Sequence, residues 1–406
     1  MAFFQYRARN ARGQLNQGRL EAASAQAAAD SLISAGLMPV EIKETKAGAK
    51  ASINWQQFLH GKVKLEALLI LCRQFSSLTR AGIPILRIVE GLRDTTDNKL
   101  LIKALNDVAD ALNQGQTLAN ALAAHPHIFN SLFISLVDVG ESTGQLEQAF
   151  AQLSHYFQLE LDTRRRVKAA TRYPMFVSIA MIGAMVVLNI YVIPAFSGIF
   201  AGLGADLPWT TKLLISSSEF FTTYIVHMLV GFIVGGFAIW RYVNTKNGQL
   251  RWHSLLLRIP IIGPLVNRIL LARFCRSFSM MLGAGVPIVR VLTLAGTATG
   301  NAYLTQAMLG MGDQLSSGSS LSRVAADSGV FTPLILQMFK VGEETGRVDQ
   351  MVMEAGKFYE EEVDYDIANL TSKIEPILIV VISCMVLLLA LGIFTPMWDM
   401  LDLIQG

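Results

Sequence analysis

Two glutamates are the residues of this chain whose type and spacing most suggest a binding site. Glu141 and Glu343 occupy the same position of a motif, V-G-E-x-T-G, which occurs at 139–144 and again at 341–346. A carboxylate held at a turn could accept hydrogen bonds from a cationic partner or contribute to an ion site. It could equally be a turn residue with no partner outside the chain, and the sequence leaves both interpretations open.

The glycines of the same motif have a structural interpretation. Gly140 and Gly342 are predicted to end helices in the left-handed conformation, which a residue without a β-carbon adopts at little cost. Gly144 and Gly346 would then relax the turn, and the hydroxyl groups between them could cap the helix that follows.

Two runs of charge form a second candidate site. The basic run consists of Arg164, Arg165 and Arg166, and the acidic run contains Glu360, Glu361 and Glu362. Each run precedes a long apolar segment. The basic run can be explained by anchoring at the cytoplasmic side of a membrane, and the acidic run by a solvated helix face. The alternative is that the two runs pair with each other, or with their copies in a neighbouring chain.

Motifs of catalysis and of cofactor binding are missing from the sequence. The segment 13–19 comes nearest to a G-x-x-x-x-G-K-[ST] phosphate loop, but it has Arg19 where that loop needs lysine followed by a hydroxyl. The three cysteines (Cys72, Cys275 and Cys384) are too far apart for a four-ligand metal site. We therefore predict no enzymatic activity, no cofactor and no metal. A net charge of +3 gives no reason to expect nucleic-acid binding.

Composition points to a membrane protein. Of the 406 residues, 52% are hydrophobic and only 16% are charged, against about 25% charged in ordinary soluble domains. The apolar residues concentrate at 174–194, 224–240 and 376–396. At about 1.5 Å per residue the first and last runs reach roughly 30 Å, the thickness of the hydrocarbon core of a bilayer. Three transmembrane helices are predicted.

Lysine and arginine set the orientation of these helices. Arginines crowd the start of the first apolar run and follow the second, whereas 195–223 contains one lysine and 397–406 contains none. Since basic residues are retained on the cytoplasmic side, segments 1–173 and 241–375 should be cytoplasmic, and the short loop and the tail should lie outside.

Comparison of the chain with itself reveals an internal repeat. Residues 72–87 recur at 275–290 with nine of sixteen positions identical, and the V-G-E-x-T-G motif and the prolines that begin and end the spans follow at nearly the same offset. In both copies an apolar three–four periodicity stops at Gly82 or Gly285 and restarts at Pro84 or Pro287. Each repeat is therefore predicted to be a bundle of about six short helices followed by one transmembrane helix.

The N-terminus has no counterpart in the second half. Alternation in FFQYRAR, around residues 17–21 and in MPVEIKE, with an alanine-rich stretch from Ser24 to Gly36, predicts a β-β-α-β module. The fold class is thus a mainly α membrane protein with a small β-containing module. The predicted order is module 1–45, linker 46–60, helical domain 61–173, span 174–194, outer segment 195–223, span 224–240, helical domain 241–375, span 376–396 and outer tail 397–406.

These residues resemble a known family. The twin F-S-x-L/M-x-x-A-G-I/V-P segments, the twin V-G-E-x-T-G segments and the opening F4-x-Y6-x-A8 with Gly13, Gly18 and Gly36 are similar to the type II secretion system F family. Members are the inner-membrane platform proteins of type II secretion systems and type IV pili. The opening is most similar to the branch that serves mannose-sensitive haemagglutinin pili.

The resemblance implies a non-enzymatic scaffold in the bacterial inner membrane, with a cytoplasmic N-terminus and a periplasmic C-terminus. Its implied partners are a cytoplasmic hexameric assembly ATPase, pilins or pseudopilins, other inner-membrane assembly proteins, membrane lipid and further copies of the chain. The alternative functions are a subunit of a transporter or permease, or a membrane receptor. A conduit for solutes would need several polar groups inside the spans, and these are missing from the sequence.

The charge pattern predicts a topology that reporter fusions can check. Fusions after residues 60, 210, 300 and 406 should report cytoplasm, periplasm, cytoplasm and periplasm, because basic residues flank the spans on one side only. A periplasmic reading at residue 300 would remove the second span and with it the parallel orientation of the two repeats.

Overall fold

A computed structural model describes residues 2–9, 15–22, 26, 29, 38–45, 63–195 and 209–405. The chain divides into two compact units, Met1–Gly61 and Lys62–Gly406. The predicted linker at 46–60 lies outside the described residues.

The first unit contains a three-stranded antiparallel sheet, as predicted. Its strands are β1 (Ala2–Arg9), β2 (Leu15–Ala22) and β3 (Met38–Thr45), in the order β2-β1-β3. The register of β3 shifts between Arg7 and Ala8, where Ala8 lies opposite Pro39. Proline has no N–H to donate to a ladder, and it is found at edge strands and bulges for that reason. Of the helix predicted from Ser24 to Gly36, only Gln26 and Ala29 are described, and both are helical.

The second unit begins with a bundle of six helices that correspond to the first repeat. They are α3 (Leu65–Arg80), α4 (Ile85–Thr95), α5 (Lys99–Asn113), α6 (Leu118–Ala123), α7 (Ser131–Ser142) and α8 (Leu146–Val187). Apolar residues recur on one face of each helix and meet in a common core, where the rings of Phe75 and Phe150 stack with centroids 3.9 Å apart.

The second repeat forms a bundle of six helices in the same order. They are α12 (Ile262–Gly283), α13 (Ile288–Ala298), α14 (Ala302–Ser316), α15 (Leu321–Ser328), α16 (Pro333–Thr345) and α17 (Val348–Ala368). Gly82 and Gly285 end the first helix of their repeats with φ of +75° and +91°, and Pro84 and Pro287 are the N-cap residues of the next helix. The predicted repeat and its number of helices are confirmed.

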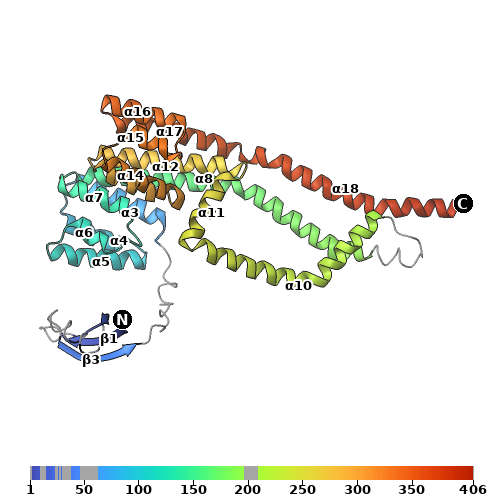
Figure 1. Ribbon diagram of the computed structural model, residues 1–406, viewed down its shortest axis with the longest axis horizontal. Coiled ribbons are helices and arrows are strands. Elements are labelled where there is room, and N and C mark those ends of the chain that lie inside the picture. Colours follow the sequence, from blue (N-terminus) through green and yellow to red (C-terminus); the bar gives the residue numbers. More distant parts are fainter. Residues whose placement is uncertain are drawn as a thin grey trace. The chain divides into compact units, whose positions relative to one another are not determined.

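Within the described residues, three helices are long and apolar enough to cross a membrane. They extend over Leu146–Ala195, Ile215–Val243 and Val348–Leu387. The first is α8, which continues through a π-helical turn, η1 (Leu188–Val192); the others belong to α10 (Trp209–Val243) and to α17 with α18 (Leu370–Gln405). Figure 1 shows α8 and α18 extending from the bundles in the same direction.

The long helices extend beyond the predicted spans. Pro174 lies inside α8 and does not interrupt it, so the part of α8 before Pro174, which we call the stalk, and the first part of the predicted span form one helix of 42 residues. The predicted span 224–240 lies inside α10, and this helix begins earlier, at Trp209. Lys212 and Glu219 lower the hydropathy of the first part of the helix.

A sharp bend joins the second span to the second bundle. After α10 comes α11 (Lys246–Arg258), and α11 and α12 meet at 113°. At the bend Ile261 has φ +71° and ψ −52°, and the N–H of Ile262 donates to the carbonyl of Pro260 at 2.9 Å. This is a γ-turn of the strained kind. The side chain of Ile261 packs on a small apolar cluster that contains Leu265 and Ile367, and this packing stabilises the turn.

In the V-G-E-x-T-G motif the left-handed residue is the second glycine, whereas the prediction gave this conformation to the first. Gly140 and Gly342 lie inside α7 and α16 rather than ending them, and the left-handed residues are Gly144 and Gly346, with φ of +73° and +70°. The prediction for the first pair was wrong because the helices continue for one more turn. What requires glycine at Gly140 is a close approach, since a β-carbon there would lie 2.7 Å from Cβ of Ala149.

The hydroxyl groups of the first motif do not cap the following helix either. Ser142 and Thr143 both donate back to the carbonyl of Val139, at 3.0 and 2.7 Å. The N-cap residue of α8 is Gln145, and its side chain makes no capping hydrogen bond.

The close approach at Gly140 can be tested with alanine. Gly140→Ala should lower the free energy of unfolding by about 1–3 kcal/mol, because the added methyl group meets α8. Gly91→Ala on α4 is the matched control: Gly91 is also helical, but nothing lies within 4 Å of its added β-carbon, so it should be neutral or stabilise by up to about 1 kcal/mol. Thermal unfolding of the full-length protein in detergent gives both values, and equal effects would contradict the close-approach explanation.

Candidate functional site

The carboxylates of the repeated motif bind short helices of their own bundles. Oε1 and Oε2 of Glu141 accept the backbone N–H groups of Leu118 and Ala119 at 2.7 and 2.9 Å. These are the first two residues of α6, whose N–H groups have no partner within the helix. A negative charge at this end is also favoured by the helix dipole.

The second copy of the motif repeats this contact. Glu343 accepts the N–H of Leu321 at 2.8 Å, and both the N–H and the hydroxyl group of Ser322, at 3.1 and 2.6 Å. Burial by itself would raise the pKa of Glu343, but the hydrogen bonds from Ser322 and Leu321 outweigh burial and leave the pKa below its usual value. The recurrence of glutamate therefore has a structural explanation: two acceptor oxygens bind the free end of α6 or α15.

The basic run on α8 contributes one ion pair to α17, the helix that forms the stalk of the second repeat. Arg166 pairs with Asp364 of α17. Arg164 instead binds Glu160 one turn earlier on its own helix, with Nε 2.7 Å from Oε1, and Arg165 is 3.7 Å from Glu66.

The acidic run on α17 pairs mainly with arginines of α12. Nε of Arg276 donates to Glu360 at 2.8 Å, and Arg268 lies 3.2 Å from Glu362. Glu361 is exposed and forms no ion pair within the described part of the chain. Within the chain, Glu360 and Glu362 thus pair with arginines of α12, which packs along α17, and not with Arg164–Arg166. The alternative of pairing between the two runs is met only by Arg166, whose partner Asp364 lies in the same acidic stretch.

The strongest contact between the repeats was missed by sequence reasoning. Glu160 on α8 is buried, at 5% exposed, and Arg273 on α12 donates to both of its oxygens, with Nε at 2.8 Å and Nη2 at 2.6 Å. Such a two-point contact fixes both distance and orientation. A sequence signal exists: Arg268, Arg273 and Arg276 lie on neighbouring turns of one helix, opposite a stretch of α17 and α8 that is rich in carboxylates.

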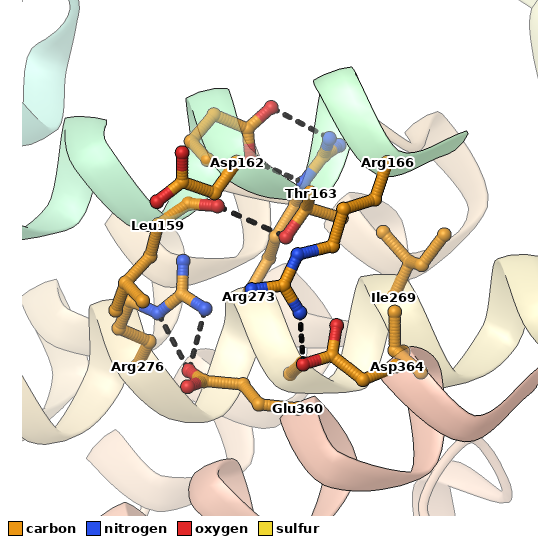
Figure 2. Close-up of a pocket in the computed structure, with 12 residues that line it drawn as sticks. Leu159, Asp162, Thr163, Arg166, Ile269, Arg273, Arg276, Glu360 and Asp364 are labelled. Carbon is orange, nitrogen blue, oxygen red and sulfur yellow. Dashed lines mark hydrogen bonds and ion pairs between the residues drawn. The ribbon is translucent and has the colours of Figure 1, made fainter. Parts of the chain in front are cut away.

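These charges surround a small pocket between α8, α12 and α17. Figure 2 shows Arg166 and Asp364 pointing toward each other across it, with Arg276 and Glu360 alongside. The pocket also contains Asp162 and Thr163 and measures about 70 Å³. The carboxylates of Glu160, Glu360 and Asp364 are each paired with an arginine, so none of the three is a free base or metal ligand.

Two buried cysteines lie outside this pocket. Burial raises the pKa of the Cys72 and Cys275 thiols well above the ordinary value, which leaves them protonated and unreactive. No cluster of three or more metal-ligating side chains occurs among the described residues. The pocket is best understood as an electrostatic contact that holds the two repeats together.

The contribution of this contact can be measured by removing one partner at a time. Arg273→Met should lower the free energy of unfolding by about 3–5 kcal/mol, because it leaves a buried carboxylate without its main partner. Arg164→Met is the matched control on the same carboxylate. The Arg164 side chain is 62% exposed, and its loss should cost under about 1 kcal/mol.

The double variant Glu160→Met/Arg273→Met should regain most of the lost stability, since it removes the unpaired charge. Thermal unfolding of the full-length protein in detergent measures all three variants. Equal losses in the two single variants, or no recovery in the double variant, would contradict this account.

Comparison with known proteins agrees with the fold. The type II secretion system (T2SS) protein F family matches residues 71–194 and 274–396, and the N-terminal domain of type II secretion system protein F matches residues 1–43. The two longer matches coincide with the two repeats and their following spans, and the shorter match covers β1, β2 and β3 except for the last two residues of β3.

Relatives from several bacteria are similar over nearly the whole chain. The type IV pilus assembly protein PilC of Myxococcus xanthus is 30% identical over 100% of this chain and 96% of its own length. That of Thermus thermophilus is 31% identical over 99% and 98%. The type II secretion system protein F of Aeromonas hydrophila is 28% identical over 95% and 99%. The duplicated bundles, the membrane helices and these matches together establish that the chain belongs to the type II secretion system protein F family.

Proposed function

We propose that this protein is the inner-membrane platform of a type IV pilus or type II secretion assembly machine. The observation that carries the proposal is the continuity between bundle and membrane. The helix α8 extends from the core of the first bundle into a span without interruption. In the second bundle α17 leads into α18 with a single turn residue, Asn369, between them. A force applied to either cytoplasmic bundle would therefore reach the bilayer along a helix rather than through a loop.

The proposed partners are those that the resemblance to the family implies. The cytoplasmic bundles would contact a hexameric assembly ATPase, and the membrane helices would contact pilins or pseudopilins, other inner-membrane assembly proteins and lipid. The chain would act as a homo-oligomer and a scaffold rather than as an enzyme. The N-terminus would lie in the cytoplasm and the C-terminus in the periplasm, as the charge pattern predicts.

The alternative of a transporter subunit gains no support from the polar groups of the described spans. Asn189 lies in the π-helical turn η1 and donates to the carbonyl of Met185 at 2.9 Å. Ser218 of α10 donates to the carbonyl of Asn189. These groups bond one helix to its neighbour, as is common where helices pack in a membrane, and they do not outline a path for a solute.

The platform function predicts an effect on a partner enzyme. The purified protein in lipid nanodiscs should hydrolyse no ATP, because it has no phosphate loop, and it should raise the ATP hydrolysis of its cognate assembly ATPase. Arg273→Met should reduce that stimulation, whereas Arg164→Met should leave it unchanged, since only the former disturbs the contact between the bundles. Hydrolysis by the chain alone that survives removal of contaminating ATPases would contradict the scaffold role.

A further inference from the structure

The contact between the two repeats uses a different face of each. The first repeat contributes α7 and α8, and the second contributes α12 and α13. Tyr156 on α8 lies beside Arg276 and Ser277 of α12, and Arg290 of α13 donates to the hydroxyl group of Ser135 on α7 at 3.4 Å. The contact is therefore head-to-tail, and a contact of this kind can be continued by further units.

The second repeat has the counterpart of the α7–α8 face, and it is uncovered. Residues of α7 and α8 match those of α16 and α17 at an offset of 202, so Tyr156 corresponds to Phe358 and Ser135 to Gln337. Tyr156 is 5% exposed, whereas Phe358 is 46% exposed. We name the surface formed by Gln337, Phe358, Glu361 and Tyr365 the outgoing face.

The first repeat has the counterpart of the α12–α13 face, and it is uncovered too. At an offset of 203, Arg276 and Ser277 correspond to Arg73 and Gln74, and Arg290 corresponds to Arg87. Ser277 is fully buried, whereas Gln74 is exposed. We name the surface formed by Ile70, Arg73, Gln74 and Arg87 the incoming face.

We propose that the outgoing face of one chain binds the incoming face of a second copy of the chain, in the way that the first repeat binds the second within one chain. This deepens the proposed self-association of the platform by naming its surfaces. Its assay contains no ATPase and no pilin, so its failure would leave the coupling role untouched.

The chemistry of the two faces is complementary. The outgoing face combines the aromatic rings of Phe358 and Tyr365 with the carboxylate of Glu361, which has no ion-pair partner in the described part of the chain. The incoming face combines the guanidinium groups of Arg73 and Arg87 with an apolar side chain, Ile70, that is 53% exposed. In the proposed contact Arg73 would lie over Phe358, as Arg276 lies near Tyr156, and a guanidinium group on an aromatic ring is a favourable pair.

One part of the contact within a chain, the buried ion pair between Glu160 and Arg273, would not recur in the contact between chains. The counterparts of Glu160 and Arg273 are Glu362 and Ile70, and Glu362 is already paired with Arg268 of its own bundle. In its place, Ile70 would meet Tyr365, which is 65% exposed. The contact between chains would therefore lack the buried ion pair and would be weaker than the contact within a chain, as suits an assembly that forms and dissociates.

The membrane permits this mode of association. The stalks α8 and α17 contact each other and lead to spans that extend in the same direction (Figure 1). Superposing the first repeat on the second would therefore be close to a rotation about an axis perpendicular to the plane of the bilayer. Applying it again moves a second copy around that axis and keeps its spans in the membrane.

Crosslinking of purified full-length protein in proteoliposomes tests the proposal. In a Cys384→Ala background, Gln337→Cys and Arg87→Cys are combined in one chain and treated with a short bis-maleimide. Cys72 and Cys275 are buried and should not react. A head-to-tail contact predicts a ladder of dimers and larger species. When chains that carry only Gln337→Cys are mixed with chains that carry only Arg87→Cys, crosslinking should give dimers and no larger species.

Two further variants distinguish a contact through the proposed faces from non-specific contact between chains. Phe358→Glu in the doubly substituted chain should lower the crosslinked fraction by roughly tenfold or more, because it places a charge against an apolar contact. Leu309→Glu is the matched control, since Leu309 of α14 is also 46% exposed but belongs to neither face. It should leave the ladder unchanged, and thermal unfolding should show that both variants remain folded.

Several results would overturn the proposal. One is the absence of crosslinks while the protein stays folded. Another is crosslinking of Gln337→Cys chains with one another alone, which would indicate a two-fold contact. A third is an equal loss with Leu309→Glu, which would show that the crosslinks do not depend on the outgoing face.

Discussion

The carboxylate of Glu160 is the group on which the arrangement of the two repeats depends. It is buried, and a buried carboxylate without partners would be very costly. Arg273 satisfies both oxygens from the other repeat, and Arg164 adds a hydrogen bond from the same helix. Because the geometry of this contact is narrow, it fixes the position of α12 against α8, and the ion pair between Arg166 and Asp364 then joins the stalks nearer the membrane.

Because the two repeats share one pattern, equivalent residues can be compared, and some of them make different contacts in the two bundles. In the first repeat Arg73 of α3 donates to the amide of Gln158 at 2.8 Å, and in the second the matching Arg276 donates to the carboxylate of Glu360. The first pair is exposed and only one member is charged, whereas the second is largely enclosed and ionic. The second repeat thus has an ionic pair where it is packed against the first, while the order of helices is the same in both repeats.

Features set by local sequence could be predicted, and features set by distant contacts could not. Apolar periodicity and the recurrence of Gly82–Pro84 at Gly285–Pro287 were sufficient for six helices per repeat, because helix ends depend on neighbouring residues. The role of Gly140 was missed because what requires it is Ala149 on another helix. The arginines of α12 were missed for a related reason: the pattern identifies charged faces but does not say which faces meet.

The two connections between bundle and membrane are mechanically unequal, and this follows from local structure. The helix α8 has Pro174 in its interior but continues as one element, whereas α17 ends at Ala368 and α18 begins after Asn369. The apolar cluster of Val363, Ile367, Leu370 and Leu265 lies at this junction and also receives Ile261 from the bend before α12. Packing therefore supports the second connection, where the single turn residue Asn369 separates the two helices. A displacement of α12 would move both α17 and the bend before α12 at this junction. At the first connection it would be transmitted along the single helix α8.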